Sequence, residues 1–302
     1  LVPPSIAEAV ASAVAVVSEA AGAAPPAAGA AEEEAQAQSH SILMEQVDAA
    51  QEEGDFATAR ALLAGIRGRM KKQAPNKPED PYILQRLALV TYKSKLPTEE
   101  ESLREACDIL WSLDPETSND PETLGLWAAV HKRLWALKQD RVDLDKAVRA
   151  VERGFYLRND HYNGINLAFL LNLRASGAAD PAEAVADFVQ ARRIRREVLA
   201  ICDRWVAENP APDAAALSPD ALDKALEARY WMLATQAEAA IGLEDPRGDQ
   251  LLREAFAAAP HDWMKESTQQ QVDKLRGLLA DSPLKHVAPA VPPAPAPAPT
   301  GD

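Results

Sequence analysis

Apolar residues recur every three to four positions along most of the chain, which is the spacing of amphipathic α-helices. Few segments show the strict alternation, rich in valine and isoleucine, that half-buried β-strands require. The pattern therefore predicts an all-α protein. Its predicted helices run from Ser41 to Gly54, from Phe56 to Met70, and over Pro81–Lys95, Thr98–Leu113, Pro121–Lys138, Asp143–Leu157, His161–Ala175, Pro181–Glu208, Ser218–Ile241, Pro246–Ala258 and Asp262–Leu279.

Helix start and stop signals divide these runs into pairs. Gly54 and Asp55 end the first helix and cap the second, and Thr98 forms a capping box with Glu101. Small residues such as Ala59 fall where two neighbouring helices have to approach closely. We predict helical hairpins of the tetratricopeptide kind, stacked into an α-solenoid, because each hairpin has an apolar face that it cannot bury alone.

The predicted repeats are degenerate. Corresponding alanines of two second helices, Ala106 and Ala147, lie 41 residues apart, whereas a regular repeat of this kind has about 34 residues. A single irregular helical bundle is the alternative architecture.

Composition separates the helical region, residues 39–281, from the two ends of the chain. Residues 1–38 are mostly Ala, Pro and Glu, and residues 282–302 are rich in Ala and Pro. Such segments bury too little surface to offset the entropy of ordering, so we predict disordered linkers or tails at both ends. The chain begins at Leu1, which leaves open that it is a processed product or part of a longer protein with an upstream domain.

The sequence has 302 residues and a formal net charge of −14, which disfavours a general nucleic-acid or anionic-membrane surface. No apolar run reaches the roughly 18 residues that a membrane helix needs. Cys107 and Cys202 lie far apart in predicted helices, so a reducing compartment, the cytoplasm, is the simplest interpretation. The composition, rich in Ala, Pro and Arg, favours a bacterial source.

Catalytic and cofactor-binding motifs such as GxxxxGK[ST], GxGxxG, GxSxG, HExxH and CxxC are absent from the sequence. We therefore predict no enzymatic activity, no cofactor and no metal site. The carboxylates are spread along helix faces and near helix starts, where they face solvent and favour the helix dipole. The competing hypothesis is a hydrolase, or a nucleotide-dependent fragment, with a dispersed site built from carboxylates and His131.

One predicted helix face combines Trp127, His131 and Trp135, which lie on neighbouring turns. Core packing is the ordinary role of such residues. Solenoids, however, bind peptides in a concave groove. We predict that these three residues, together with Asn166, line such a groove.

A basic cluster of Arg192, Arg193, Arg195 and Arg196 lies inside the helix predicted over residues 181–208. Arg192, Arg195 and Arg196 share one face of that helix, so they are candidates for binding an acidic peptide or a phosphate. Ion pairing with neighbouring acidic helices is the alternative.

The stretch Ala147–Leu171 joins two of the predicted helices through a polar bend at residues 159–160. Gly164 would permit a close helix approach or an unusual backbone angle at the helix start. Asn166 is predicted to hydrogen-bond the backbone of the bend. We interpret Gly154, Gly164 and Asn166 as a structural joint that fixes one hairpin against the next.

The order of residues around this joint resembles a known family. The segments Glu122-Thr-Leu-Gly125, Leu144-Asp-Lys-Ala147, Gly154-Phe155 and Tyr162-Asn-Gly-Ile-Asn-Leu-Ala168 are similar to the TRAFs-binding domain of the apoptosis signal-regulating MAP kinase kinase kinases and its bacterial relatives. The resemblance covers residues 121–171 well and 39–281 loosely. It implies a tetratricopeptide-like regulatory region within a signalling or defence protein. Kinase motifs are absent from the sequence, so the resemblance implies scaffolding and not kinase activity.

Together these observations predict a non-catalytic protein-interaction module that acts as an adaptor, a sensor or a regulatory scaffold. Its partner would be a protein or peptide, with an effector domain in the same or a neighbouring chain. A purely structural, oligomerising protein is a third hypothesis.

Overall fold

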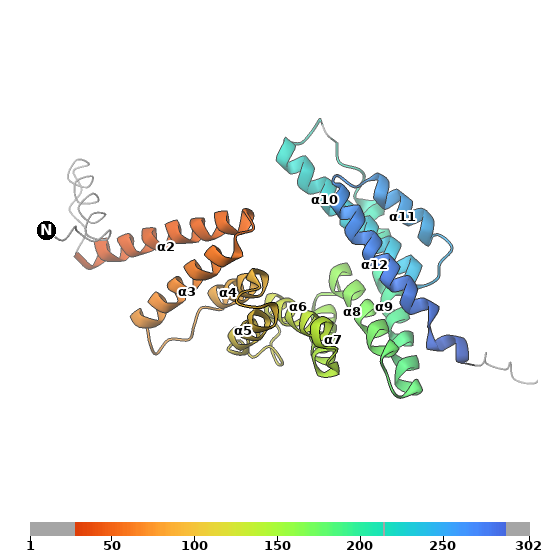
Figure 1. The fold of residues 1–302 in the computed structure, drawn as a ribbon. Helices are drawn as coiled ribbons and strands as arrows, with labels where there is room; N and C mark the ends of the chain where they lie inside the picture. The colour runs from red at the N-terminus through yellow and green to blue at the C-terminus, as the bar shows by residue number, and fades with distance from the viewer. Residues whose placement is uncertain (1–27, 214, 288–302) are drawn as a thin grey trace, which may run out of the picture. The chain divides into compact units, whose positions relative to one another are not determined.

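The computed structural model describes residues 28–213 and 215–287, and these ranges are helical without a strand (Figure 1). The predicted all-α fold is therefore confirmed. The helices are α2 (Ala28–Glu52), α3 (Phe56–Gln73), α4 (Pro81–Ser94), α5 (Glu99–Trp111), α6 (Pro121–Lys138), α7 (Arg141–Arg158), α8 (His161–Ser176), α9 (Pro181–Glu208), α10 (Pro219–Gly242), α11 (Gly248–Ala257), α12 (Asp262–Ala280) and the 3-10 helix η1 (Pro283–His286).

Most helix boundaries lie close to their predicted positions, and the first helix is the exception. Helix α2 begins at Ala28 and not at Ser41, so residues 28–38, which the sequence placed in a tail, are helical. This run is rich in alanine, glutamate and glutamine. These residues have high helix propensity, which extends the helix beyond its apolar face. The predicted tail segments 1–27 and 288–302 lie outside the described residues.

Aspartates fix where several helices begin. Asp80, Asp120 and Asp180 each precede a proline in the first turn of a helix, and the carboxylate of each accepts a hydrogen bond from a backbone N–H of that turn. Backbone N–H groups in the first turn of a helix have no acceptor within the helix, so a proline there loses no hydrogen bond. The fixed φ of proline also suits the helical backbone. In each Asp-Pro pair the aspartate thus provides an acceptor for a backbone N–H of the first turn, and the helix begins at a defined residue.

The two predicted cap signals are present in the structure. Gly54 has a φ of +76°, and the Asp55 carboxylate accepts a 3.0 Å hydrogen bond from the backbone N–H of Thr58. Thr98 Oγ1 accepts a 3.2 Å bond from the N–H of Glu101 and donates a 2.7 Å bond to its carboxylate.

The described chain divides into two compact units, one ending at Gln139 and the other beginning at Asp140. In the first unit the consecutive helices α2 to α6 pack on one another. Ala59 and Leu63 of α3 and Leu84 of α4 are almost completely buried. This successive pairing is that of a tetratricopeptide-like α-solenoid, as predicted.

In the second unit, α10 is the central helix, and it packs against α8, α9, α11 and α12. One apolar cluster brings together Tyr230 of α10, Ala255 of α11 and Met264 of α12. Helix η1 belongs to this unit as well, because Leu284 packs against a cluster that contains Phe188. Residues 283–286 are therefore folded, although the sequence predicted a tail from residue 282. In the part of the chain that the structure describes, no helix is long and apolar enough to span a bilayer.

The joint between α7 and α8 is built on two glycines. A Cβ atom on Gly164 would lie 2.4 Å from Val198 Cγ2 and 2.8 Å from the Phe155 ring, and one on Gly154 would lie 3.2 Å from Asn163 Oδ1. Glycine is therefore required at residue 164 by close helix packing and not by a positive φ. This geometry supports the interpretation of the stretch as a structural joint.

Asn166 does not make the predicted bond to the bend that precedes α8. Its Nδ2 donates a 2.8 Å hydrogen bond to the carbonyl of Tyr162, one turn earlier. Asn163 contacts the bend instead: its backbone N–H and its Nδ2 each donate a 2.8 Å bond to the Asp160 carboxylate. The prediction chose the wrong asparagine because the Asp160 cap reaches only the first turn of the helix.

Candidate functional site

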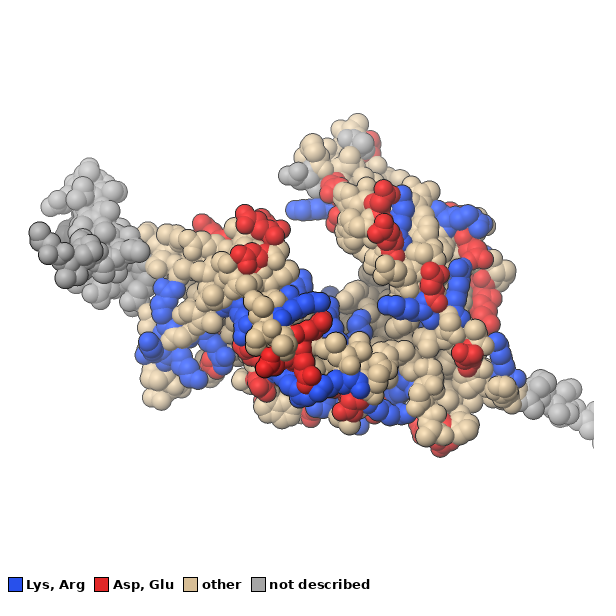
Figure 2. All heavy atoms as spheres, viewed as in Figure 1, with Lys and Arg blue, Asp and Glu red and all other residues tan. Residues whose placement is uncertain are grey.

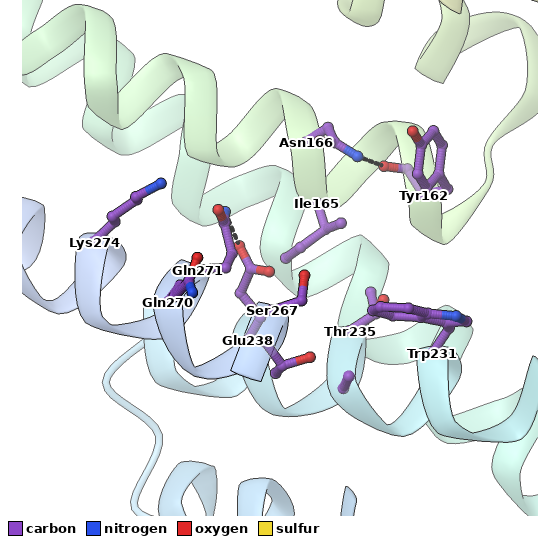
Figure 3. A pocket seen from close by; sticks show the side chains of 12 residues that line it. Tyr162, Ile165, Asn166, Trp231, Thr235, Glu238, Ser267, Gln270, Gln271 and Lys274 are labelled. Atoms are coloured by element: carbon purple, nitrogen blue, oxygen red, sulfur yellow. Dashed lines mark hydrogen bonds between the residues drawn. The ribbon is translucent and has the colours of Figure 1, made fainter. Parts of the chain in front are cut away.

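A hollow on the second unit is surrounded by α8, α10 and α12, three helices that are far apart in the sequence (Figure 3). Its volume is about 300 Å³. We call it the α8–α10–α12 groove. Its lining residues are Tyr162, Ile165, Asn166, Trp231, Ala234, Thr235, Glu238, Ser267, Thr268, Gln270, Gln271 and Lys274.

The first turns of α8 form one wall of the groove. Tyr162 is 68% exposed and Ile165 is buried, so the wall has an open aromatic edge and an apolar base. Because Asn166 uses its amide N–H₂ to bond the Tyr162 carbonyl, its side-chain oxygen is held in a fixed orientation (Figure 3). That oxygen accepts no hydrogen bond from a described residue.

Trp231 on α10 presents the second aromatic ring. It is 37% exposed and lies between two other rings, with centroid distances of 5.1 Å to Tyr230 and 6.0 Å to Trp263. The Tyr230 hydroxyl donates a 2.8 Å hydrogen bond to the Met264 carbonyl and lies 2.7 Å from Thr268 Oγ1. Burial raises the pKa of Tyr230, against the opposing effect of its hydrogen bond with Thr268. Tyr230 thus ties α10 to α12 and fixes the helix that carries Trp231.

Helix α12 supplies the amide-rich side of the groove. Gln271 Nε2 donates a 3.1 Å hydrogen bond to the carboxylate of Glu238, which is only 9% exposed (Figure 3). Gln270 and Lys274 are exposed, and neither forms a hydrogen bond or an ion pair within the described ranges. These two side chains are therefore available to a ligand.

A buried cation lies close to the groove. Arg195 of α9 is completely buried, and its Nη1 donates a 2.6 Å hydrogen bond to Asn172 Oδ1. Burial lowers the pKa of Arg195 to about 10, against the opposing charge of Glu238. A Cβ atom on Gly242 would lie 2.1 Å from Arg195 Nε, so only glycine leaves room for the guanidinium there.

The predicted basic cluster is therefore not a continuous docking surface. Arg195 is buried, which contradicts its prediction as a ligand contact. Arg192 forms a 3.1 Å ion pair with Glu244, as the alternative hypothesis expected. Arg196 is exposed. The helix face that residues 192 and 195 share is turned toward α10, because α9 packs against that helix.

The predicted aromatic groove on α6 is also corrected by the structure. Trp127 and His131 are each 3% exposed, and their rings meet edge to face at a centroid distance of 4.2 Å. Cys107 Sγ lies 3.8 Å from His131 Nε2. These side chains belong to the interior of the first unit and offer a partner no surface. Trp135 is only partly buried, and its role in binding stays a prediction.

Asn166, which the sequence analysis named, lines the groove, and its role in binding stays a prediction; the α10 and α12 sides of the groove were missed. Trp231 looked like one more core aromatic residue, and its pairing with α8 depends on tertiary packing. The signal that was available is the polar run Ser267-Thr-Gln-Gln-Gln271. Five consecutive uncharged polar residues are unusual in a helix whose other exposed positions are mostly charged.

The chemistry of the groove is suited to binding. Its lining offers amides, hydroxyls, two aromatic rings, one carboxylate and one ammonium group, without a histidine or cysteine. Burial raises the pKa of the Cys202 thiol, elsewhere in the unit, to about 12, so it is not an activated nucleophile. On the face drawn in Figure 2, lysines and arginines are interspersed with aspartates and glutamates. That surface favours specific contacts over attraction to a polyanion.

Comparison with known proteins gives one family. Residues 11–171 match the Tetratricopeptide Repeats-Sensor family, so the match ends within α8 and includes the Tyr162 and Asn166 wall of the groove. Repeats of this type generally mediate protein–protein interaction and are generally non-catalytic. No curated protein matches the chain. Because the match covers more than half of the chain, the protein belongs to the Tetratricopeptide Repeats-Sensor family.

Proposed function

We propose that the protein is a non-catalytic interaction module whose α8–α10–α12 groove binds an extended peptide segment of a protein partner. The observation that carries this proposal is the juxtaposition of exposed aromatic rings and unpaired amide groups on three helices that hold one another in place. It agrees with the general role of this repeat type in protein interaction.

The aromatic residues supply the anchor for the peptide. Tyr162 and Trp231 expose large rings on either side of the groove, and both belong to the residue types that dominate binding energy at interfaces. The volume of about 300 Å³ lies at the lower end of the range for ligand pockets. The groove is therefore expected to take one or two side chains of a peptide and not a large cofactor.

The free amides favour an extended peptide over a helix. The oxygen of Asn166 and the amide of Gln270 have no partners within the described ranges. An extended peptide presents unpaired N–H and C=O groups to such side chains, whereas the interior of a helix has already paired its own. Each such bond contributes about 0.5–1.5 kcal/mol, so the amides select the backbone conformation and the aromatic rings supply most of the affinity.

We further propose that this module is the adaptor, sensor or regulatory scaffold of a signalling or defence system. The resemblance of residues 121–171 to the TRAFs-binding domain supports a regulatory role, with an effector domain in the same or a neighbouring chain. Neither Cys107 nor Cys202 forms a disulfide in the described part of the chain, which supports action in a reducing compartment such as the cytoplasm.

A deep pocket that joins His131 to two buried acids would favour the hydrolase hypothesis. Instead, the His131 ring packs against Trp127 and lies beside Cys107 in the interior of the first unit. This packing gives the hydrolase hypothesis no support.

The experiment is a selection of random displayed peptides on the full chain, followed by anisotropy measurements with the selected peptides after synthesis. In the Trp231→Ala variant we expect binding to weaken by at least about 10-fold, since loss of a central aromatic contact commonly costs 2 kcal/mol or more. Gln270→Ala is expected to weaken binding less, by a few-fold, because it removes a single neutral hydrogen bond.

The matched control is Trp111→Ala, because Trp111 is 57% exposed and lies on α5 in the other unit. Circular dichroism checks that each variant is folded. Peptides that bind Trp231→Ala and Gln270→Ala as tightly as the unchanged protein would show that the groove is not the docking site.

A further inference from the structure

A second group of side chains, outside the α8–α10–α12 groove, brings together a histidine and two carboxylates. Asp223 and Glu227 lie on α10, and His261 directly precedes α12. The Nε2 atom of His261 lies 3.5 Å from Asp223 Oδ1 and 3.4 Å from Glu227 Oε1. One ligand atom from each of the three residues falls within 4.8 Å of the others.

The helix places the two acids side by side. Asp223 and Glu227 are four residues apart, so they project from the same face of α10 on adjacent turns. Two like charges at this spacing repel each other. No described lysine or arginine forms an ion pair with either carboxylate. The pair therefore lacks a permanent cationic partner.

His261 is turned toward this pair. It occupies the cap position of α12, yet its side chain makes no capping hydrogen bond to the helix. Its distances to the two carboxylates are longer than the 2.7–3.2 Å of an ordinary N–H···O hydrogen bond. The imidazole nitrogen is thus nearly equidistant from the two oxygens without bonding closely to either.

These distances are those of ligands that share a metal ion. Zinc binds histidine nitrogen and carboxylate oxygen at about 2.0–2.2 Å, so two ligands at adjacent corners of a tetrahedron lie about 3.3–3.5 Å apart. We propose that Asp223, Glu227 and His261 form a binding site for a zinc-type divalent transition-metal ion. The imidazole nitrogen favours such an ion over Mg²⁺ or Ca²⁺, which prefer oxygen ligands.

The site supplies three protein ligands and is open to solvent. The side chains of Asp223, His261 and Glu227 are 53%, 40% and 38% exposed, so water completes the coordination sphere. A bound ion links the first half of α10 to the start of α12. The site is independent of the proposed peptide groove, because Asp223, Glu227 and His261 are not among the residues that line it.

The test is isothermal titration of the full chain with ZnCl₂, after treatment with a chelator and buffer exchange. We expect one ion per chain at this site, and an excess of MgCl₂ should not displace it. Each of three variants should bind zinc at least about 10-fold more weakly: Asp223→Asn, Glu227→Gln and His261→Gln. Changing a residue that only hydrogen-bonds a metal ligand already costs about this much affinity, so loss of a ligand itself should cost no less.

The matched control is His286→Gln, because His286 is an exposed histidine outside the cluster. This variant should bind Zn²⁺ as the unchanged protein does. Since none of the three ligands is buried, their variants should remain folded, and circular dichroism verifies this. Unchanged zinc affinity in His261→Gln, or no zinc binding by the unchanged protein, would overturn the proposal.

Discussion

Gly164 marks the tightest point of the joint between α7, α8 and α9, and its replacement by alanine tests that packing directly. A Cβ atom there would lie 2.4 Å from Val198 Cγ2 and 2.8 Å from Phe155 Cε2. Both distances are well below van der Waals contact. Val198 is completely buried and Phe155 is 1% exposed, so neither side chain can swing into solvent. The helices themselves have to move apart.

Two opposing effects set the size of the change. Overpacking a close-packed interior typically costs about 1–3 kcal/mol, and the rigidity of both neighbours places Gly164→Ala in the upper half of that range. Alanine is favoured over glycine within a helix by about 1 kcal/mol. We therefore expect Gly164→Ala to lower the free energy of unfolding of the second unit by about 1–2 kcal/mol.

The same substitution at Gly277 is the matched control. Gly277 lies on α12 in the same unit, and a Cβ atom there would meet nothing within 4 Å. Gly277→Ala should therefore raise the free energy of unfolding by about 0.5–1 kcal/mol through helix propensity alone. Urea denaturation followed by circular dichroism measures both variants, and hydrogen exchange of α8 and α9 peptides assigns the change to the second unit.

A Gly164→Ala variant as stable as Gly277→Ala would refute the close-packing argument. The double variant Gly164→Ala/Val198→Ala adds a second check, because it removes the nearest clashing methyl group. The two changes should then be non-additive by at least about 0.5 kcal/mol, in the direction of mutual relief. Simple additivity would mean that Val198 does not restrict residue 164.

Two further predictions concern the helices around the groove. Tyr230→Phe removes the hydroxyl that bonds the α12 backbone and Thr268, so it should destabilise the second unit by about 1–2 kcal/mol in urea denaturation. Tyr156 is exposed, and Tyr156→Phe should change stability by less than about 0.5 kcal/mol. An equal loss in both variants would contradict the role of Tyr230 in tying α10 to α12. Burial, partly opposed by the charge of Asp160, lowers the pKa of His161 below 6.5, so the unfolded chain takes up this proton first. The contribution of His161 to stability is then fully present above pH 6.5 and is lost as the pH falls through the folded-state pKa. Denaturation at pH 7.5 and 5.5 should show that the free energy of unfolding falls less in His161→Gln than in the unchanged protein. Equal decreases would count against the burial effect.

The sequence was sufficient to predict the helices because their ends are encoded locally. Asp-Pro pairs, the Gly54–Asp55 turn and the Thr98–Glu101 box each act within one helical turn, so no tertiary information is needed to place them. The start of α2 was missed for a related reason. Residues 28–38 form a helix by backbone propensity without an apolar stripe, and hydrophobic periodicity cannot detect such a segment.

The candidate site was less predictable because exposure is decided by tertiary packing. Trp127 and Trp231 both lie on amphipathic helices, yet Trp127 is 3% exposed and Trp231 is 37% exposed. Their local sequences do not show which one faces a neighbouring helix. The prediction for the basic cluster was wrong for the same reason. Four arginines in five positions of a helix suggest an exposed basic surface, but α10 packs against one side of that helix.

Arg195, which was predicted to contact a ligand, is buried and interacts with a residue that lines the α8–α10–α12 groove. Arg195 Nε and Nη2 have no hydrogen-bond partners in the described part of the chain, so the electrostatic attraction of Glu238 is a main compensation for its desolvation. Glu238 in turn is held by Gln271 in the groove wall. One carboxylate therefore stabilises the buried cation and also lines the groove. The groove can keep an almost buried acid in its lining because the neighbouring helix supplies the opposite charge.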